Sequence, residues 1–232
     1  MKDMKIIKDL KLDLDEEEIL RYQGYSRNKV REPNQNILRI TEEEINRGYS
    51  LFKPQGIYSL IKIKGSALEG RINLESGLIF RFAKSIIKQL KGASHLLVGV
   101  VTIGDLLEKK VSDLFSQGEY PRALTLDVIG TVAVEDFSRK VRKLARQEVI
   151  ERGFKTSRHF SPGYSGWEVS QQEIVFKSIP SDNIGVSLTK GFMMLPQKSL
   201  SWVIGAGKEI IVSSEEENKC KDCQSKYCNY KL

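Results

Sequence analysis

The feature of the sequence that most constrains the fold is one long amphipathic segment, roughly residues 120–152. Its apolar side chains recur every three or four residues, a spacing that predicts an α-helix with one face against a core. They are Val134, Phe137, Val141, Leu144 and Ala145. Glu148 falls on the same stripe, seven residues after Val141. A carboxylate there costs free energy unless it is paired or solvated, so either the helix tilts into water at this turn or the carboxylate is aimed at a cation in a cleft.

Shorter segments on both sides of it predict further helices and strands. Residues 57–65 alternate apolar and polar side chains, as a half-buried strand does, and the β-branched run at 94–104 predicts a strand buried on both faces. Helices are expected at 80–92, at 105–118 and at 170–179, and short strands follow the last of these. We therefore predict an α+β fold with a central mixed or antiparallel sheet and long flanking helices.

Three parts are expected along the chain. Residues 1–52 form a helical arm: one helix follows the acidic run in "LDEEEILRYQGY", and Thr41 with Glu44 forms a capping box for a second. Residues 53–212 form the α+β core, and residues 213–232 form a cysteine-rich tail.

Composition narrows the classes of partner. The 232 residues include 37 basic and 30 acidic side chains, a net charge of +7. This balance suits an anionic partner, but no run of Lys and Arg forms a nucleic-acid tail, so no nucleic-acid partner is expected. The longest apolar stretch, 96–101, is far shorter than a membrane span, and the N-terminus lacks the apolar core of a signal peptide. A cytoplasmic protein without a membrane span is expected.

One loop, "RHFSPGYSGW" at 158–167, concentrates recognition chemistry. Pro162 and Gly163 shape the backbone so that its polar groups can face a ligand. Tyr164 and Trp167 offer flat surfaces for an adenine ring or a cation, and the loop's arginine offers a fork for a carboxylate. S-adenosylmethionine has an adenine, a positive centre and a carboxylate. The same residues also suit a sharp turn with both rings packed beneath it.

The loop and the segments around it resemble the activation domain of cobalamin-dependent methionine synthase. That family has an Arg-x-x-x-Gly-Tyr-type loop, then a helix, then a "T.S..M.P..S.SG" stretch. Here the loop is followed by "EVSQQEIVFKSI" and then by "IGVSLTKGFMMLPQKSLSWVIG". Upstream, "LDVIGTVAVEDF" is similar to the family's Asp-Tyr-Ile-Gly-x-x-Ala-Val segment. The matches cover about residues 120–207, in the order that the family has them.

The resemblance implies an S-adenosylmethionine site in an α+β domain. It assigns the family's ligand-binding aspartate to Asp127. The loop that holds the ligand corresponds to Ser161, Pro162, Gly163 and Tyr164.

Two further assignments stay open under the resemblance. The loop arginine lies four residues before the glycine in that family, and His159 stands there in this chain, with Arg158 one position earlier. Either Arg158 reaches the ligand's carboxylate or His159 takes its place. The family also uses glutamates near the ligand, for which Glu148 and Glu151 are the candidates.

The resemblance also implies a function. In that family the domain returns inactive cob(II)alamin to methylcobalamin, with an electron from a flavodoxin-type donor and a methyl group from S-adenosylmethionine. This chain has no room for the synthase's other modules and no Asp-x-His-x-x-Gly cobalamin signature. We therefore expect a reactivase acting in trans on a methionine synthase that lacks this domain or on another corrinoid protein, with a flavodoxin-like or ferredoxin-like donor. The alternative is a non-catalytic docking or assembly module, so whether the chain is an enzyme stays open.

All three cysteines lie in the tail, as Cys220, Cys223 and Cys228. A Cys-x2-Cys pair can grip one metal ion, and neighbouring lysines favour the thiolate. An iron–sulfur cluster, or zinc completed by His95, His159 or a partner residue, is expected. A disulfide with one free thiol and three reduced thiols are the other possibilities. A cluster would fit a reaction that needs one electron.

Overall fold

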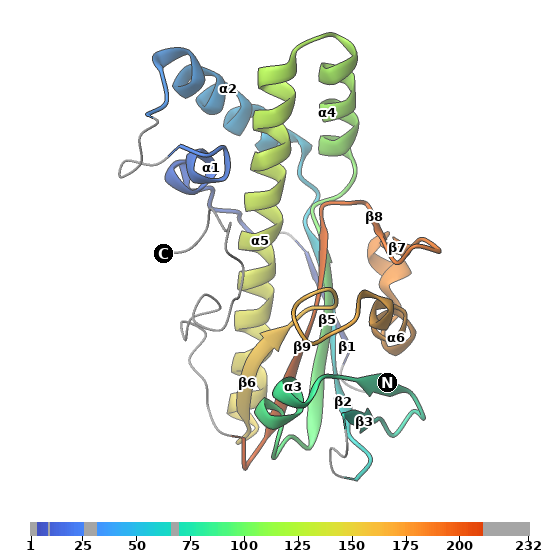
Figure 1. The fold of residues 1–232 in the computed structure, drawn as a ribbon. Coiled ribbons are helices and arrows are strands. Elements are labelled where there is room, and N and C mark those ends of the chain that lie inside the picture. The colour runs from blue at the N-terminus through green and yellow to red at the C-terminus, as the bar shows by residue number, and fades with distance from the viewer. Residues whose placement is uncertain (1–3, 9, 26–31, 66–69, 211–232) are drawn as a thin grey trace.

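The computed structural model describes residues 4–8, 10–25, 32–65 and 70–210. Its centre is a five-stranded antiparallel sheet in the order β1–β2–β5–β9–β6 (Figure 1). The strands are β1 (Met4–Lys8), β2 (Gln55–Lys62), β5 (His95–Thr102), β6 (Lys155–Phe160) and β9 (Ser199–Gly207). The central strand β5 comes from the predicted apolar run and is buried from Leu96 to Thr102. Such burial is expected for a strand that is covered on both faces.

Helix α5 (Tyr120–Glu151) covers one face of this sheet, as the long amphipathic segment predicts (Figure 1). It approaches the sheet closely at Gly56, where a β-carbon would lie only 3.3 Å from Val141 Cγ2. Helices α1 (Glu16–Tyr22), α2 (Gln35–Leu51) and α4 (Leu106–Ser116) pack against α5. Four of the five apolar residues predicted to face the core are buried, whereas Leu144 is 38% exposed. No helix in the described part of the chain is both long and apolar enough to cross a membrane.

Short elements cover the opposite face of the sheet. They are β3 (Arg71–Asn73), β4 (Ile79–Arg81), α3 (Lys84–Gln89), η1 (Val169–Gln171), α6 (Gln172–Ser178), η2 (Ser181–Ile184), β7 (Ser187–Leu188) and β8 (Met194–Leu195). With the sheet they enclose a second core that includes Phe80, Val98 and Val203. The sheet is therefore a central layer between two hydrophobic cores, which confirms the predicted α+β class.

The N-terminal segment differs from the predicted helical arm. Residues 4–8 form strand β1, which pairs with β2 from Met4↔Ser59 to Lys8↔Gln55 and so belongs to the central sheet. Helix α2 begins at Gln35, because the side chain of Asn34 caps it by accepting a hydrogen bond from the backbone N–H of Ile37 (2.9 Å). Thr41, the predicted cap, lies inside this helix and is buried.

Two other predicted helices differ at their starts. The 80–92 segment divides into strand β4 and helix α3, because residues up to Arg81 pair with β3. In the 170–179 segment, Ser170 belongs to the short 3₁₀ helix η1 and does not cap α6. The predicted helices at 105–118 and 120–152 are confirmed as α4 and α5.

Buried ion pairs fasten the N-terminal segment to α5. Arg122 binds Glu44, which is fully buried in α2, with Nη1 2.6 Å from Oε1. Further along α5, Asp136 is 3% exposed and accepts a hydrogen bond from the backbone N–H of Asp13 (3.0 Å). The same carboxylate binds Lys140 Nζ at 2.8 Å. A charged group buried with several partners holds its neighbours in one arrangement, because removing any partner leaves a charge uncompensated.

The Asp136 carboxylate predicts a pH-dependent stability. Burial alone would raise its pKa, but hydrogen bonds from Asp13, Lys140 and Arg139 outweigh burial, so the pKa lies below the ordinary 3.8. A lowered pKa stabilises the folded state fully above the ordinary value, and this stabilisation is lost as the pH falls through the folded-state pKa. Asp136→Asn should therefore lower the free energy of unfolding at pH 7 by about 1–3 kcal/mol. Urea unfolding of both proteins should show a smaller difference between their free energies of unfolding at pH 3 than at pH 7. A difference that does not depend on pH would contradict a lowered pKa of Asp136.

Candidate functional site

A polar stripe runs down one side of α5. It consists of Asp127, Thr131, Glu135, Ser138, Arg142 and Arg146, spaced three or four residues apart and so on one side of the helix. The first part of the stripe contacts Lys198, the residue that precedes β9. Lys198 Nζ lies 2.8 Å from Asp127 Oδ1 and donates to Thr131 Oγ1 at 2.9 Å. The upper end of the stripe is therefore an ion pair between α5 and the start of β9.

The lower part of the stripe is basic and meets strand β6. The Arg142 side chain is 7% exposed and donates from Nη1 to Ser138 Oγ at 2.6 Å. One turn further, Arg146 Nη1 donates to Thr156 Oγ1 of β6 at 3.0 Å. The stripe thus changes from carboxylates at its upper end to guanidinium groups at its lower end, along one helix.

The loop at 161–167 is a compact turn between β6 and η1. The Gly163 N–H donates to the Trp167 carbonyl at 2.8 Å, and the Trp167 N–H donates to the Tyr164 carbonyl at 2.9 Å. Gly163 has φ +91°, a left-handed conformation that other residues adopt only with strain. The turn closes on Ser161, whose carbonyl accepts from the Tyr164 N–H at 3.2 Å. Pro162 lies within this turn, and Tyr164 is at its tip with 52% of its surface exposed.

Tyr164 is within electrostatic range of the middle of the stripe. Burial of its hydroxyl raises the pKa above its ordinary value, the Glu135 carboxylate raises it further, and the Arg142 guanidinium acts in the opposite sense. Both charged side chains are therefore within electrostatic range of the phenol oxygen. The structure brings together an exposed aromatic ring, a carboxylate and a guanidinium group.

The second aromatic ring of the loop has a structural role. Trp167 is only 2% exposed, and its ring centre lies 4.7 Å from that of Phe82 and 5.9 Å from that of Phe80. It packs under the loop in the second core. Of the two interpretations of this ring, packing beneath the turn therefore applies to Trp167, whereas the Tyr164 ring stays exposed.

Arg158 and His159 lie on opposite faces of the sheet. Paired residues in an antiparallel ladder share a face, and His159 pairs with Ile204, which belongs to the core under α5. Phe160 pairs with Val203 of the other core, and the Arg158 guanidinium carbon lies 5.2 Å from the centre of the Phe160 ring. Of the two candidates for the loop arginine's role, His159 is therefore the one on the side of the stripe.

The structure does not bring Glu148 together with the loop. Its carboxylate forms an ion pair with Lys5 of β1. Burial raises the pKa of Tyr58 on β2, and the nearby Glu148 carboxylate raises it further. Glu148 thus faces the β1–β2 edge of the sheet, whereas the loop follows β6 at the other edge. Glu151, on the last turn of α5, is exposed.

Asp127 and the cysteines complete the predicted set. Asp127 lies on the stripe, fifteen residues before Arg142, which is about 22 Å along a helix. Cys220, Cys223 and Cys228 lie outside the described residues. Within residues 4–8, 10–25, 32–65 and 70–210, no group of three His, Cys, Asp or Glu side chains could hold a metal ion.

Sequence reasoning missed Glu135, Arg142 and Lys198. The signal for the first two was present, since polar residues recur at helical spacing on the side of α5 that the apolar stripe leaves free. Lys198 had no local signal, because its contacts with α5 are made across the fold.

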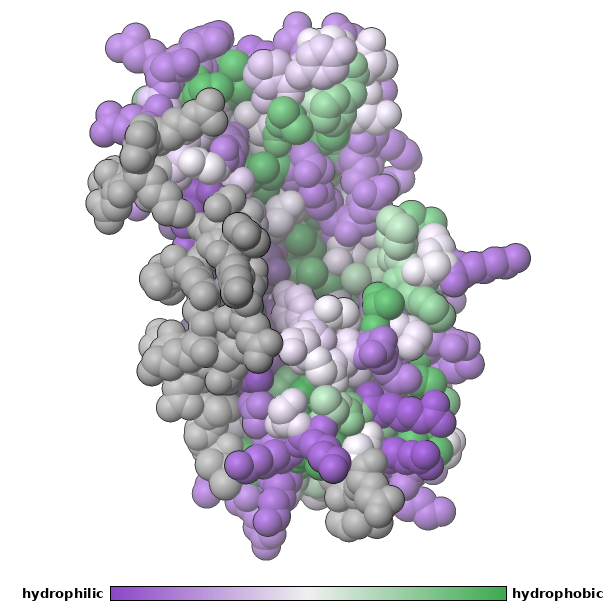
Figure 2. Space-filling model, in the orientation of Figure 1, coloured by the Kyte–Doolittle hydropathy of each residue, from purple (hydrophilic) through white to green (hydrophobic). Residues whose placement is uncertain are grey.

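The molecular surface is hollowed beside this stripe. Figure 2 shows the hollow between α5 and the β7–β8 segment, with hydrophobic side chains gathered in it. Exposed apolar residues belong to the segments around it: Met193 and Leu195 at β8 are 57% and 43% exposed. An aromatic or alkyl group of a ligand can therefore be covered here on more than one side.

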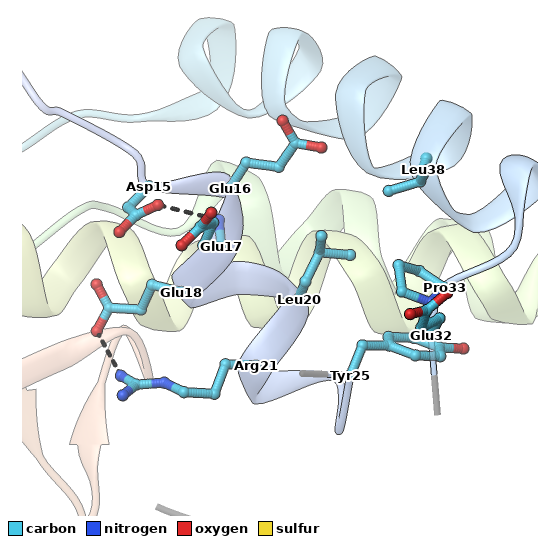
Figure 3. Close-up of a pocket in the computed structure, with 10 residues that line it drawn as sticks. All are labelled: Asp15, Glu16, Glu17, Glu18, Leu20, Arg21, Tyr25, Glu32, Pro33 and Leu38. Carbon is cyan, nitrogen blue, oxygen red and sulfur yellow. Dashed lines mark hydrogen bonds and ion pairs between the residues drawn. The ribbon is translucent and has the colours of Figure 1, made fainter. Parts of the chain in front are cut away.

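A second cavity, of about 1050 Å³, lies between α1 and α2. Figure 3 shows its acidic lining, including Asp15, Glu16 and Glu18, beside Leu20 and Leu38. The Asp15 side chain accepts from the Glu17 N–H at 3.0 Å, and Glu18 binds Arg21. These carboxylates stabilise the N-terminus of α1, and none of the predicted ligand-binding residues lines this cavity.

Comparison with known proteins places the fold. No protein-family model matches the chain, and no curated protein sequence matches it. Among solved structures, the MetH reactivation domain bound to AdoHcy matches with a TM-score of 0.64 and 11% identity. The match covers 91% of this chain and 81% of that one. The chain therefore has the fold of that reactivation domain, which confirms the fold that the resemblance implies.

Proposed function

We propose that this protein binds S-adenosylmethionine between the stripe of α5 and the loop at 161–167, and that it remethylates the cobalamin of a separate corrinoid protein. The observation that carries the proposal is the exposed Tyr164 ring at the tip of the loop, within electrostatic range of Glu135 and Arg142 on the stripe. The fold supports it, because the matching reactivation domain was solved with AdoHcy, the demethylated product of this methyl donor.

The charges of the site match those of the ligand. S-adenosylmethionine has a carboxylate, an ammonium group, a sulfonium and an adenine. Arg142 is suited to the carboxylate, since a guanidinium group offers two parallel donors. Glu135 is suited to the ammonium or sulfonium, and the Tyr164 ring to the adenine or to the sulfonium.

The proposed methyl transfer requires the protein mainly to position the methyl donor relative to the partner's cobalt. When bound, S-adenosylmethionine supplies its methyl group to the cobalt of the partner's cobalamin and leaves as AdoHcy, while an external donor supplies one electron. The S–CH₃ bond breaks as the methyl group is transferred, and no proton moves on the protein. The residues of the stripe and the loop therefore hold the methionine end and the adenine so that the methyl group stays exposed to the partner.

Calorimetric titration with S-adenosylmethionine tests the site. The wild-type protein should bind saturably. Tyr164→Ala should weaken binding at least tenfold because the ring surface is lost, whereas Tyr164→Phe should stay within about threefold because it keeps that surface. Glu148→Gln is the control, since that side chain faces the β1–β2 edge, and it should leave the affinity unchanged.

The same titration separates the two candidate functions. Binding that disappears in Tyr164→Ala leads to a reactivation assay with a cob(II)alamin protein, S-adenosylmethionine and a flavodoxin-type reductant, in which methylcobalamin should form. No binding to the wild-type protein would contradict a methyl-donor site. It would favour the docking module, in which Lys198 neutralises Asp127 and a histidine stands in the loop arginine's place.

A further inference from the structure

Lys198 is held beside the polar stripe by contacts of both its backbone and its side chain. Its backbone N–H donates to Glu108 Oε1 of α4 at 2.7 Å, and its carbonyl accepts from the Ile103 N–H at 3.2 Å. The aliphatic part of the side chain lies over Gly130 of α5, where a β-carbon would be only 3.2 Å from Lys198 Cε. The side chain is 15% exposed. This lysine therefore has a fixed position in the fold, in contrast to a solvated surface lysine.

The ammonium group of Lys198 neutralises one of the two carboxylates on the stripe. Nζ lies 2.8 Å from Asp127 Oδ1 and donates to Thr131 Oγ1 at 2.9 Å. The Asp127 side chain is half-exposed, so its charge would act on the hollow beside the stripe if it were unpaired. Glu135, the other carboxylate, follows Thr131 by four residues, which is about 6 Å along the helix. The ion pair therefore lies about one helical turn from the carboxylate that is proposed to bind a cationic group of the ligand.

The methyl donor and its product differ by one positive charge. S-adenosylmethionine has a sulfonium, whereas AdoHcy has an uncharged thioether at the same atom. Charges interact over a helical turn in a site that is partly shielded from water, so an unpaired carboxylate at Asp127 would favour the donor over the product. A carboxylate that is paired with an ammonium group has little such effect. The Lys198 charge therefore bears on how well the site distinguishes the two ligands.

We propose that Lys198 is a specificity-determining residue, which limits the preference of the site for S-adenosylmethionine over AdoHcy by neutralising Asp127. This role rests on the proposed function, because it requires a methyl donor bound beside the stripe. The sulfur loses its positive charge as the methyl group departs, so an unpaired carboxylate nearby stabilises the bound donor more than the transition state and raises the barrier. By pairing with Asp127, Lys198 keeps the donor from being bound too tightly for transfer.

Calorimetric titration with both ligands tests this role. The ratio of the dissociation constant for AdoHcy to that for S-adenosylmethionine measures the preference for the donor. Lys198→Met should raise this ratio by about three- to tenfold, since methionine keeps an apolar side chain over Gly130 but frees the Asp127 carboxylate. Adding Asp127→Asn to Lys198→Met should return the ratio to within about twofold of the wild-type value. Because both ligands are measured on each protein, a fraction of unfolded protein does not change the ratio.

Lys177→Met is the matched control for loss of a lysine. Lys177 pairs with Glu173 within α6, on the other face of the sheet from α5, so its replacement should leave the ratio unchanged. An unchanged ratio in Lys198→Met, or a raised ratio that persists when Asp127→Asn is added, would overturn the role of Lys198.

The same titrations separate this role from the proposed function. Binding of both ligands with an unchanged ratio overturns the role of Lys198 alone. Failure of the wild-type protein to bind either ligand would contradict the proposed function. In that case, binding of S-adenosylmethionine by Lys198→Met would still show that Lys198 keeps the cationic ligand from Asp127, and no binding by that variant would overturn the role of Lys198 as well.

Discussion

Replacing Arg142 with methionine should lower the affinity for S-adenosylmethionine by about 10- to 100-fold, while the affinity for decarboxylated S-adenosylmethionine changes by less than about threefold. A hydrogen bond to a charged group contributes about 1.5–3 kcal/mol, and each 1.4 kcal/mol is a tenfold change in affinity. Only the first ligand has the carboxylate that Arg142 is proposed to bind. Methionine keeps most of the length of the buried side chain, so packing around Ser138 is disturbed little.

The pair of ligands makes this prediction independent of folding defects. A variant that is partly unfolded would lose affinity for both ligands to the same extent. Calorimetry with both ligands on both proteins therefore gives a double difference that reports the carboxylate contact alone. A parallel loss for the two ligands would show that Arg142 supports the fold of the site rather than binding the carboxylate. Glu135→Gln should give the complementary pattern and weaken both ligands, because both keep the sulfonium.

Much of the fold could be predicted because buried elements have a recognisable pattern of apolar residues. The continuous run at 94–104 indicates a strand covered on both faces, and the stripe at 134–145 indicates a helix covered on one. Strand β1 has no such pattern. Only five residues long, it begins and ends in charged or flexible side chains and lies at the sheet edge, where burial alternates only weakly. Its assignment depends on pairing with β2, which is a tertiary interaction.

The shape of the loop was predictable from its residue types. Gly163 and Tyr164 were singled out from the Pro-Gly pair, the aromatic residues of the loop and its resemblance to the activation domain, and the structure shows Gly163 at φ +91° and Tyr164 exposed in one turn. Glu148 shows the limit of periodicity. Its position on the apolar stripe predicts which side of α5 it occupies but not which strand that side crosses, and α5 carries it to β1. Which charged groups face the loop depends on how α5 lies across the sheet.

The same dependence on tertiary packing predicts a large effect on stability at Gly99. This residue pairs across the ladder with Trp202, and a β-carbon on Gly99 would lie 2.3 Å from Trp202 Cζ2. The indole is fully buried and so has no free space to move into. Gly99→Ala should therefore lower the free energy of unfolding by about 1–3 kcal/mol, the usual cost of overpacking a core. For a chain of this size that corresponds to a melting temperature lower by roughly 2–12 °C.

A double-mutant cycle with Trp202→Leu tests whether the clash with the indole causes the loss of stability in Gly99→Ala. Trp202→Leu alone removes a large buried side chain and should also destabilise the protein. The smaller leucine leaves room for the new β-carbon, so Gly99→Ala should cost less in that background than in the wild type. Gly191→Ala is the matched control, because a β-carbon there meets only Thr189 Oγ1 at 3.9 Å, and it should change stability by less than about 0.5 kcal/mol. Additive effects of Gly99→Ala and Trp202→Leu would show that the strand backbone, rather than the indole, excludes a side chain at Gly99.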